Sequence, residues 1–349
     1  MKILISGNLG YIGPVLTKHL KQTIPSSEIT GLDIGYFASR ISSLGRIGDT
    51  YCNDQIYQDI RDVSFEFLKK FDAVIILSAI SNDPMGNKFE DVTNQINYLA
   101  VKKIIEPYLK LKNKRLVFAS SCSIYGASEG EAKKENDTLN PLTAYAKSKV
   151  AVEKALQKCE LGLGTTATSL RFATACGMSD RLRLDLVLND FVASAIIRKR
   201  IEVLSDGTPW RPLIHVKDMA RAIEWGILRN TKIAKPYLAV NVGSNSWNYR
   251  VSDLAKAVVE TVPDCQLSFN EKALPDKRSY KVNFDLFEKL ASGCNPVYEL
   301  QDAISELVDG ISEIKHLIPD DFQSSDFMRL HILENHLNNG RLSSDLRWI

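Results

Sequence analysis

The sequence has no apolar run long enough to cross a bilayer, no CxxC pair and no surplus of one charge. Lys plus Arg number 44 and Asp plus Glu 42, so charge gives no reason to expect a nucleic acid or an anionic membrane as partner. The six cysteines lack metal-ligand spacing, and we expect free thiols and no metal site. The opening MKILISG is typical of a strand rather than a signal peptide, which predicts a cytoplasmic protein.

The first half alternates short apolar runs with amphipathic segments. MKILISG, EITGLDI and DAVIILSAI are predicted strands, whereas YIGPVLTKHLKQ and VTNQINYLAVKKIIEPYLKLK are predicted helices. This order predicts an α/β Rossmann fold, a doubly wound parallel sheet, in residues 1–175. Residues 176–320 are less regular and predict a smaller C-terminal lobe with segments that return to the sheet. Residues 321–349 form a polar tail to which the sequence assigns no chemistry.

The stretch SGNLGYIG places Gly7, Gly10 and Gly13 between the first strand and the first helix. Glycines there let a pyrophosphate approach the N–H groups of the helix N-terminus. Asp33 ends the second strand, where a carboxylate accepts bonds from ribose hydroxyls and repels a 2′-phosphate, so NAD is favoured over NADP. Further expected cofactor contacts are Tyr11, Ile12, Asp59 and Ile60 (the last two at the adenine), Leu77, Ser78 and Ala79. Taken alone, the QDIRD stretch around Asp59 is also typical of a solvated turn.

The stretch AYAKSKVAVEKAL carries Tyr145 and Lys149, which share one helix face because they are four residues apart. A nearby ammonium lowers the pKa of a phenol, which would suit Tyr145 to take a proton from a sugar hydroxyl. YxxxK also occurs on plain helix surfaces, but the upstream nucleotide fold favours catalysis. Ser81 and Asn82 follow the third strand at the ligand-binding edge of the sheet and are candidate sugar contacts.

With INYLAV, SSCSIYG, LRFATACG and SDGTPWRPLIHVKD, these motifs cover residues 1–290. They resemble the extended short-chain dehydrogenases/reductases, in the NAD-dependent nucleotide-sugar epimerase/dehydratase group that includes UDP-glucose 4-epimerase. The resemblance implies that Ser121 is the hydroxyl partner of Tyr145 and that Asn97 supports the active site as one of the cofactor-binding residues. It also implies that Lys149 holds the nicotinamide ribose near Phe172, and that helices around residues 95–110 and 145–160 form a homodimer.

The resemblance further implies that the second lobe, residues 176–320, binds a nucleoside diphosphate sugar. Asn189 and Arg211 match diphosphate contacts, whereas Arg278 matches loosely and an ion pair is an equal interpretation. Pro212 stands where the family has Asp, and Thr174 where galactose epimerases have Asn, so the sugar and the base stay open. The full set of expected substrate contacts is Ser81, Asn82, Ser121, Thr174, Asn189, Arg211 and Arg278.

The residues after Ser121 bear on the type of reaction. The 4,6-dehydratases of this group carry Asp-Glu there, whereas this chain has Cys122 and Ser123, which disfavours elimination of water. A small buried residue is the favoured interpretation of Cys122, and a base for epimerisation stays open. We therefore expect a C4 epimerase, with a net dehydrogenase or ketoreductase as the alternative. A non-catalytic dinucleotide-binding protein is disfavoured by the intact Ser-Tyr-Lys set.

Overall fold

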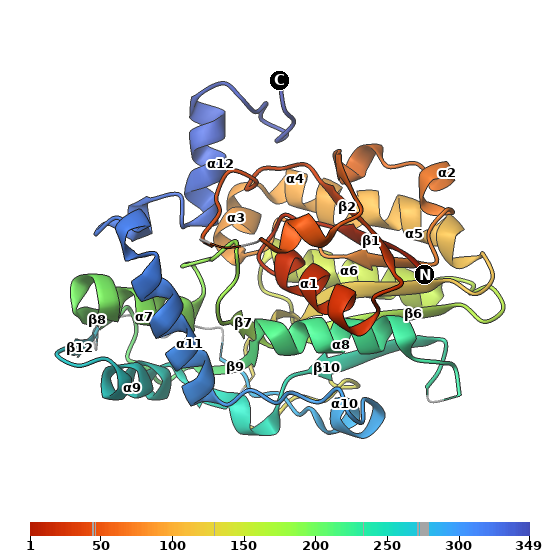
Figure 1. Cartoon of the computed structure of the whole chain (residues 1–349). Coiled ribbons are helices and arrows are strands. Elements are labelled where there is room, and N and C mark those ends of the chain that lie inside the picture. The colour runs from red at the N-terminus through yellow and green to blue at the C-terminus, as the bar shows by residue number, and fades with distance from the viewer. Residues whose placement is uncertain (44, 46, 129, 233, 271, 273–278) are drawn as a thin grey trace.

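The computed structural model describes residues 1–349 except 44, 46, 129, 233, 271 and 273–278. A seven-stranded parallel sheet forms its centre, in the order β10-β6-β5-β4-β1-β2-β3 (Figure 1). The strands are β1 (Lys2–Ser6), β2 (Glu28–Asp33), β3 (Asp54–Tyr57), β4 (Ala73–Ile76), β5 (Arg115–Ser121), β6 (Thr166–Phe172) and β10 (Tyr237–Val242). The predicted doubly wound sheet is confirmed, and β10 is a later segment that returns to it.

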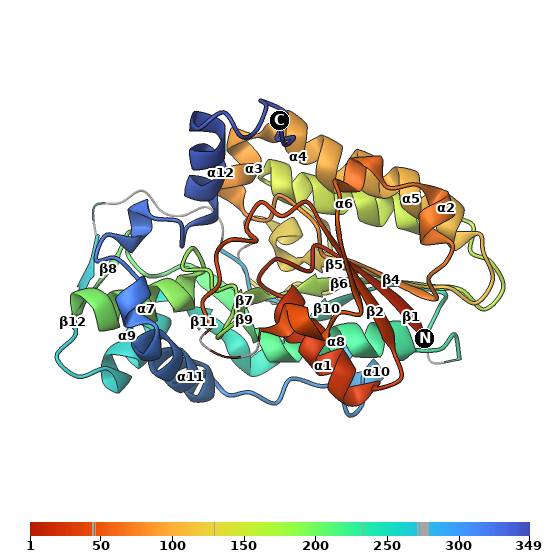
Figure 2. The ribbon, with the colours of Figure 1, turned by 45° about the horizontal axis from the view of Figure 1, so that its top comes forward.

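Helices cover both faces of this sheet (Figures 1 and 2). One face carries α1 (Gly13–Thr23), α8 (Val216–Leu228) and α10 (Asp285–Leu290), and the other α2 (Phe65–Leu68), α5 (Val101–Leu109) and α6 (Ala144–Lys158). Successive side chains of a strand point to opposite faces, so Ile3 and Ile5 pack in one hydrophobic cluster and Leu4 in the other. This double burial explains the near-continuous apolar strands of the sequence.

The long helix predicted from VTNQINYLAVKKIIEPYLKLK is divided in the structure. It consists of α4 (Glu90–Asn94), a π-helical segment η3 (Gln95–Ala100) and α5, and is preceded by α3 (Asp83–Lys88). Hydrophobic spacing alone does not distinguish a π-helical turn from α-helix. Such turns are frequent at functional sites, and this one carries Asn97.

The second half builds a smaller group of elements with a hydrophobic core of its own. It contains α7 (Val187–Arg198), α9 (Val251–Thr261) and α11 (Leu300–Glu313), with the paired strands β8 (Arg200–Val203) and β12 (Gln266–Phe269). A three-stranded sheet of β7 (Thr174–Cys176), β9 (Trp210–His215) and β11 (Asn248–Arg250) adjoins them. The boundaries at residues 175 and 320 stay predictions.

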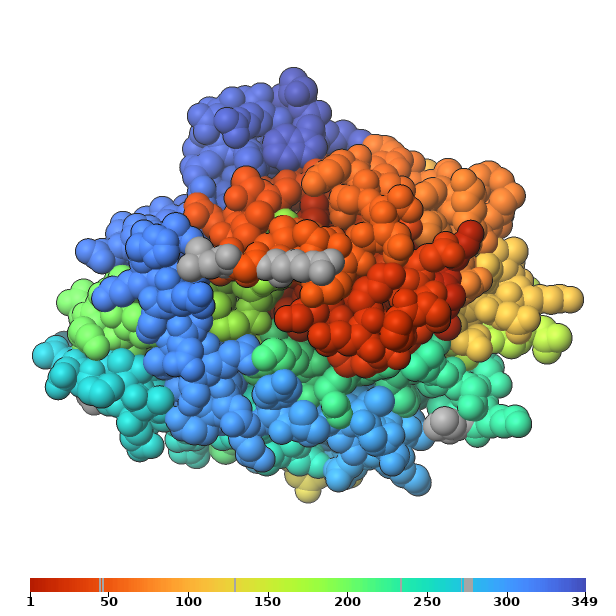
Figure 3. Space-filling view, viewed as in Figure 1, coloured from red at the N-terminus to blue at the C-terminus, as the bar shows by residue number. Residues whose placement is uncertain are grey.

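The C-terminal residues return to the N-terminal half. After η6 (Lys315–Leu317) and η7 (Phe322–Ser324), helix α12 (Arg329–Asn338) and the final residues lie over it, at the top of Figure 3. The remaining short turns are η1 (Gly48–Tyr51), η2 (Ile60–Asp62), η4 (Cys122–Tyr125) and η5 (Asn245–Trp247). Within the described ranges, no helix has the length and apolar character needed to span a membrane.

Candidate active site

The carboxyl ends of the parallel strands open onto a cavity of about 950 Å³. Ligands of doubly wound folds bind at this edge, where the strand order reverses, here between β1 and β4. The predicted residues that line it are Gly7, Gly10, Tyr11, Ile12, Asp33, Asp59, Ile60, Leu77, Ser78, Ala79, Ser81, Asn82, Ser121, Tyr145, Lys149, Phe172, Thr174 and Arg211. The structure therefore gathers most of the predicted site at one place.

The glycine loop packs its backbone against the loop after β4. Gly7 has a φ of +83°, and a Cβ there would lie 2.4 Å from the backbone nitrogen of Ser78. At Gly13 a Cβ would lie 1.8 Å from the carbonyl oxygen of Asn8. Gly13 does not line the cavity, so the structure supports for it the role of close packing between loop and helix.

Asp33 is held at the end of β2 by two backbone groups. Its Oδ2 accepts a hydrogen bond from the N–H of Leu9 at 3.0 Å, and its Oδ1 from that of Gly35 at 2.7 Å. Burial raises the pKa of Asp33, and these two bonds oppose the shift. Asp59 lines the same cavity, but its Oδ2 pairs with Nη2 of Arg61 at 2.6 Å, so the contact with adenine stays a prediction.

The residues at this end of the cavity fit a dinucleotide such as NAD. The glycine loop lies so close to the loop after β4 that no side chain fits at Gly7, and Asp33 offers a fixed carboxylate at the strand end. Gly7, Gly10, Tyr11 and Ile12 would hold the pyrophosphate side, and Asp33 the adenosine ribose.

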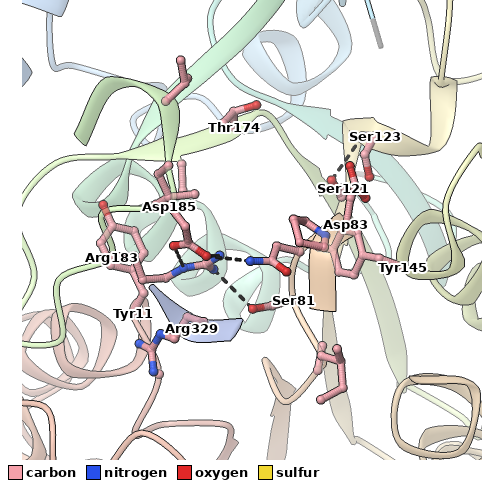
Figure 4. A pocket seen from close by; sticks show the side chains of 18 of the residues that line it. Tyr11, Ser81, Asp83, Ser121, Ser123, Tyr145, Thr174, Arg183, Asp185 and Arg329 are labelled. Carbon is pink, nitrogen blue, oxygen red and sulfur yellow. Dashed lines mark hydrogen bonds and ion pairs between the residues drawn. The ribbon is translucent and has the colours of Figure 1, made fainter. Parts of the chain in front are cut away.

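Ser121, Tyr145 and Lys149 meet at the other end of the cavity. Ser121 ends β5, and its hydroxyl lies beside Tyr145 of α6, where it lowers the pKa of the phenol. Lys149 lies one helical turn later, donates to the carbonyl oxygen of Ala119 at 2.7 Å, and has its Nζ 5.3 Å from the centre of the Tyr145 ring. Figure 4 shows Ser121 and Tyr145 side by side.

The electrostatics of this trio differ from the expectation. Burial raises the pKa of Tyr145 to about 12, although the nearby hydroxyl of Ser121 and the charge of Arg183 lower it. Burial also lowers the pKa of Lys149 to about 7, against the charge of Glu153. The prediction that the nearby ammonium leaves the phenol with a lowered pKa is therefore wrong for this structure, because desolvation of the phenolate outweighs the favourable charges.

Asn97 does not line the cavity but fixes the segments that do. It is 1% exposed, its Oδ1 accepts from the N–H of Ile80 at 2.8 Å, and its Nδ2 donates to the carbonyl of Ile80 at 3.0 Å. The same Nδ2 donates to Oγ of Ser148 at 3.1 Å. Asn97 thus joins the loop after β4 to the helix that carries Tyr145, in keeping with the supporting role implied by the resemblance.

The structure places only some of the predicted substrate contacts of the second lobe at the cavity. Thr174 and Arg211 line the cavity. Asn189 is 0% exposed and does not line it; its Oδ1 accepts from the N–H of Gly177 at 3.1 Å. Contact of Asn189 with a diphosphate is thus not supported by this arrangement and stays a prediction. Arg278 lies outside the described residues.

A buried ion pair in the cavity wall was missed by the sequence reasoning (Figure 4). Arg183 binds Asp185 through two contacts, Nε to Oδ1 at 2.8 Å and Nη2 to Oδ2 at 2.9 Å. Arg183 also donates to Oγ of Ser81 at 3.2 Å, and Asn82 donates to Asp185 at 2.6 Å. The signal was present in RLRLD, where charges alternate with apolar residues. The two candidate sugar contacts after β4 are therefore held by a charged pair of the second lobe.

Cys122 is a buried structural thiol. It is 1% exposed, donates to the carbonyl oxygen of Arg171 at 3.1 Å, and burial raises its pKa. A thiol whose pKa is raised is a poor base, so the favoured interpretation as a small buried residue is supported. All six cysteines are free, and the described part of the chain has no cluster of three or more His, Cys, Asp or Glu side chains suited to a metal ion.

Comparison with known proteins agrees with this geometry. The sequence model described as the NAD dependent epimerase/dehydratase family matches residues 3–243. An uncharacterized UDP-glucose epimerase of Bacillus subtilis, YtcB, is 26% identical, and the alignment covers 70% of this chain and 77% of that protein. Protein CapI of Staphylococcus aureus is 25% identical, with 88% and 98% covered.

Solved structures show the same fold. TunA, an NAD-dependent NDP-hexosamine 5,6-dehydratase involved in tunicamycin biosynthesis, superimposes with a TM-score of 0.75 at 19% identity, covering 89% of this chain and 98% of that one. MoeE5 in complex with UDP-glucose and NAD gives a TM-score of 0.74 at 20% identity, with 90% and 99% covered.

Proposed function

Because the chain belongs to the NAD dependent epimerase/dehydratase family, we propose that it is a nucleotide-sugar epimerase that acts through transient oxidation at C4. The observation that carries the proposal is the meeting of Ser121 and Lys149 at the phenol of Tyr145, in one cavity with the glycine loop. The name of the Bacillus relative supports a nucleotide sugar as substrate.

In this proposal Tyr145 takes the proton from the C4 hydroxyl of the sugar, and the hydroxyl of Ser121 orients both groups. The chemistry that bound NAD would supply is reversible acceptance of the hydride from C4, with return to the opposite face of the ketone after the keto sugar has rotated. Lys149 would hold the nicotinamide ribose, and in its protonated form it would stabilise the phenolate that must form. Residues 1–175 would carry the cofactor and this trio, and residues 176–320 the nucleotide sugar.

Dehydration is a second candidate, because the structure places a carboxylate in the cavity that the sequence reasoning did not consider. Asp83 lines the cavity, accepts from Oγ1 of Thr143 at 2.7 Å, and its charge raises the pKa of Tyr145. It could supply the acid that Cys122 and Ser123 do not. Net dehydrogenation or ketoreduction is the other alternative, since it needs only the Ser-Tyr-Lys trio.

A product screen separates the three reactions. Purified protein is incubated with UDP-, GDP-, dTDP- and CDP-sugars, and products are examined by NMR and mass spectrometry while the near-ultraviolet absorbance of NADH is followed. An isomer of unchanged mass without NADH supports the epimerase. Loss of water identifies a dehydratase, and stoichiometric NADH identifies a dehydrogenase.

The Tyr145→Phe variant tests the role of the phenol. Loss of the acid/base group should lower turnover at least about 100-fold while the NAD content of the purified protein is unchanged. Tyr57→Phe, at a phenol that is 68% exposed, is the matched control and should leave turnover as it is. Full activity in Tyr145→Phe would refute the mechanism.

A further inference from the structure

The C-terminal segment, residues 326–348, is bound to the loops that follow β2 and β3. Tyr36 donates to the carbonyl oxygen of Leu346, and Nε1 of Trp348 donates to that of Ile34 at 2.7 Å. Nη1 of Arg61 donates to the carbonyl oxygen of Asp345 at 2.8 Å. In the Rossmann fold these loops border the adenosine half of the dinucleotide, so the segment covers that half of the site.

Arg329, at the start of α12, reaches from this segment into the cavity (Figure 4). It is 4% exposed, and its guanidinium lies over the ring of Phe37, 4.0 Å from the centre. Its Nη1 is buried and finds no hydrogen-bond partner in the part of the chain that the structure describes. A buried charged donor without a partner is costly, which indicates that a ligand completes it.

Within the described part of the chain, no carboxylate makes a direct ion pair with Arg329. Arg183 is paired with Asp185, and Arg181 with Asp49. Burial, and next the charge of Arg183, lower the pKa of Arg329 to about 9. The charges of Asp185 and Asp33 oppose this shift without making an ion pair with Arg329, which leaves its guanidinium open to an anionic ligand.

The position of Arg329 narrows the choice of anion. Its charge interacts with Asp33, the carboxylate expected at the adenosine ribose, and it lines the same cavity as Tyr11 of the glycine loop. In a dinucleotide bound with its adenosine ribose at Asp33, the pyrophosphate follows the ribose and lies at the glycine loop. This is the part of the cofactor that Arg329 would reach. A guanidinium binds phosphate oxygens through two N–H groups.

We propose that residues 326–348 form a clasp over bound NAD and that Arg329 binds its pyrophosphate. The clasp joins the cofactor to the end of the chain, far in sequence from the glycine loop. It should slow the release of NAD, as an epimerase that reuses its cofactor requires. The inference depends on NAD binding, not on which sugar reaction occurs.

The test is the rate at which NAD bound to the purified enzyme exchanges with labelled NAD. Arg329→Met keeps the side-chain stem over Phe37, and it should speed exchange roughly 10- to 100-fold through loss of charge-assisted hydrogen bonds. Arg329→Lys keeps the charge and should stay within about 10-fold of the parent. Arg341→Met, at an exposed arginine of the same segment, is the control and should exchange at the parent rate.

Competition experiments identify what Arg329 binds. ADP-ribose retains the pyrophosphate and adenosine lacks it, so Arg329→Met should weaken ADP-ribose as a competitor of labelled NAD and leave adenosine unchanged. Equal weakening of both, or unchanged NAD exchange with weakened UDP-glucose binding, would overturn the proposal. Without NAD, Arg329→Met should melt at or above the parent temperature, because an unpaired buried charge is removed. If Arg329→Met melted at a lower temperature than the parent and exchanged NAD at the parent rate, Arg329 would serve the fold alone and the proposal would be wrong.

Discussion

Lys149 is 2% exposed, and its ammonium is held between the carbonyl of Ala119 and the ring of Tyr145. Burial of an ammonium group lowers the free energy of unfolding. Buried charges of this kind cluster at functional sites, where the charge serves the chemistry. Sequence spacing placed Lys149 beside Tyr145. It could not reveal the burial, because burial depends on the strand and loop that close over the helix.

The cost at Lys149 should appear as a dependence of stability on pH. Its pKa falls from 10.5 to about 7 on folding, so the unfolded chain binds the extra proton between these values. In nucleotide-free protein the penalty is complete below about 7 and shrinks as the pH rises to 10.5, at up to about 1.4 kcal/mol per pH unit. The gain in stability of Lys149→Met over the parent should therefore be largest below 7. Thermal unfolding across this range measures it, and a pH-independent difference would contradict the burial.

Two kinds of site residue differ in how well the sequence reveals them. Gly7, Asp33 and Tyr145 stand at fixed offsets from strand ends and helix turns, so local pattern was sufficient. Arg183 has only the alternation of charged and apolar residues in RLRLD as a local signal, and the segment of Arg329 has none, so only the tertiary fold brings them to the cavity.

Among the elements, β5, α6 and β6 are joined by a buried ion pair. Glu153 of α6 accepts from Oγ of Ser120 at 2.5 Å and from Nη2 of Arg171 at 2.7 Å. Ser120 precedes Ser121, and Glu153 lies one turn after Lys149, so this pair fixes the two elements that carry the catalytic trio.

Glu153→Gln should lower the free energy of unfolding by about 3–5 kcal/mol, because it leaves the buried guanidinium of Arg171 uncompensated. Chemical denaturation measures the loss. Glu106→Gln is the control: Glu106 faces Lys102 at 3.8 Å with both side chains exposed, and its loss should stay below about 1 kcal/mol. Equal small effects of both substitutions would show that the buried pair does not fix these elements.

The sequence predicted the β–α order, because strand and helix periodicities are local. The predicted helix of residues 92–112 is divided into α4, the π-helical segment and α5. This division was not predicted, because one extra residue in a turn hardly changes the spacing of apolar side chains. Asn97 lies in that segment and makes three hydrogen bonds through its amide, which reflects the tertiary contacts that stabilise it.

At the scale of the whole molecule, the sequence assigned no chemistry to residues 321–349, whereas the structure places them over the N-terminal half (Figure 3). Contacts such as that of Tyr36 with Leu346 join residues 310 positions apart, and no local pattern encodes them. The sheet edge that carries the site, by contrast, followed from the order of strands and helices.

The predicted homodimer is also a property of the whole molecule. The resemblance places its interface on the helices around 95–110 and 145–160, and Leu99 is 49% exposed on this face. We expect the parent to show twice the chain mass in size-exclusion chromatography with light scattering, and Leu99→Glu to shift it toward the monomer.

Leu228→Glu is the matched control for this prediction. Leu228 is 51% exposed at the end of α8, on the opposite face of the sheet, and the variant should keep the mass of the parent. A monomeric parent, or a dimer insensitive to Leu99→Glu, would place the assembly elsewhere.

The most direct test of the proposed reaction uses a nucleotide sugar deuterated at C4, taken from the panel member that is turned over. The account predicts an epimer that keeps its deuterium at C4, with no release into solvent and no accumulation of reduced cofactor. Loss of the deuterium from the sugar, or a C4 epimer that has gained solvent hydrogen there, would contradict hydride removal and return at this carbon.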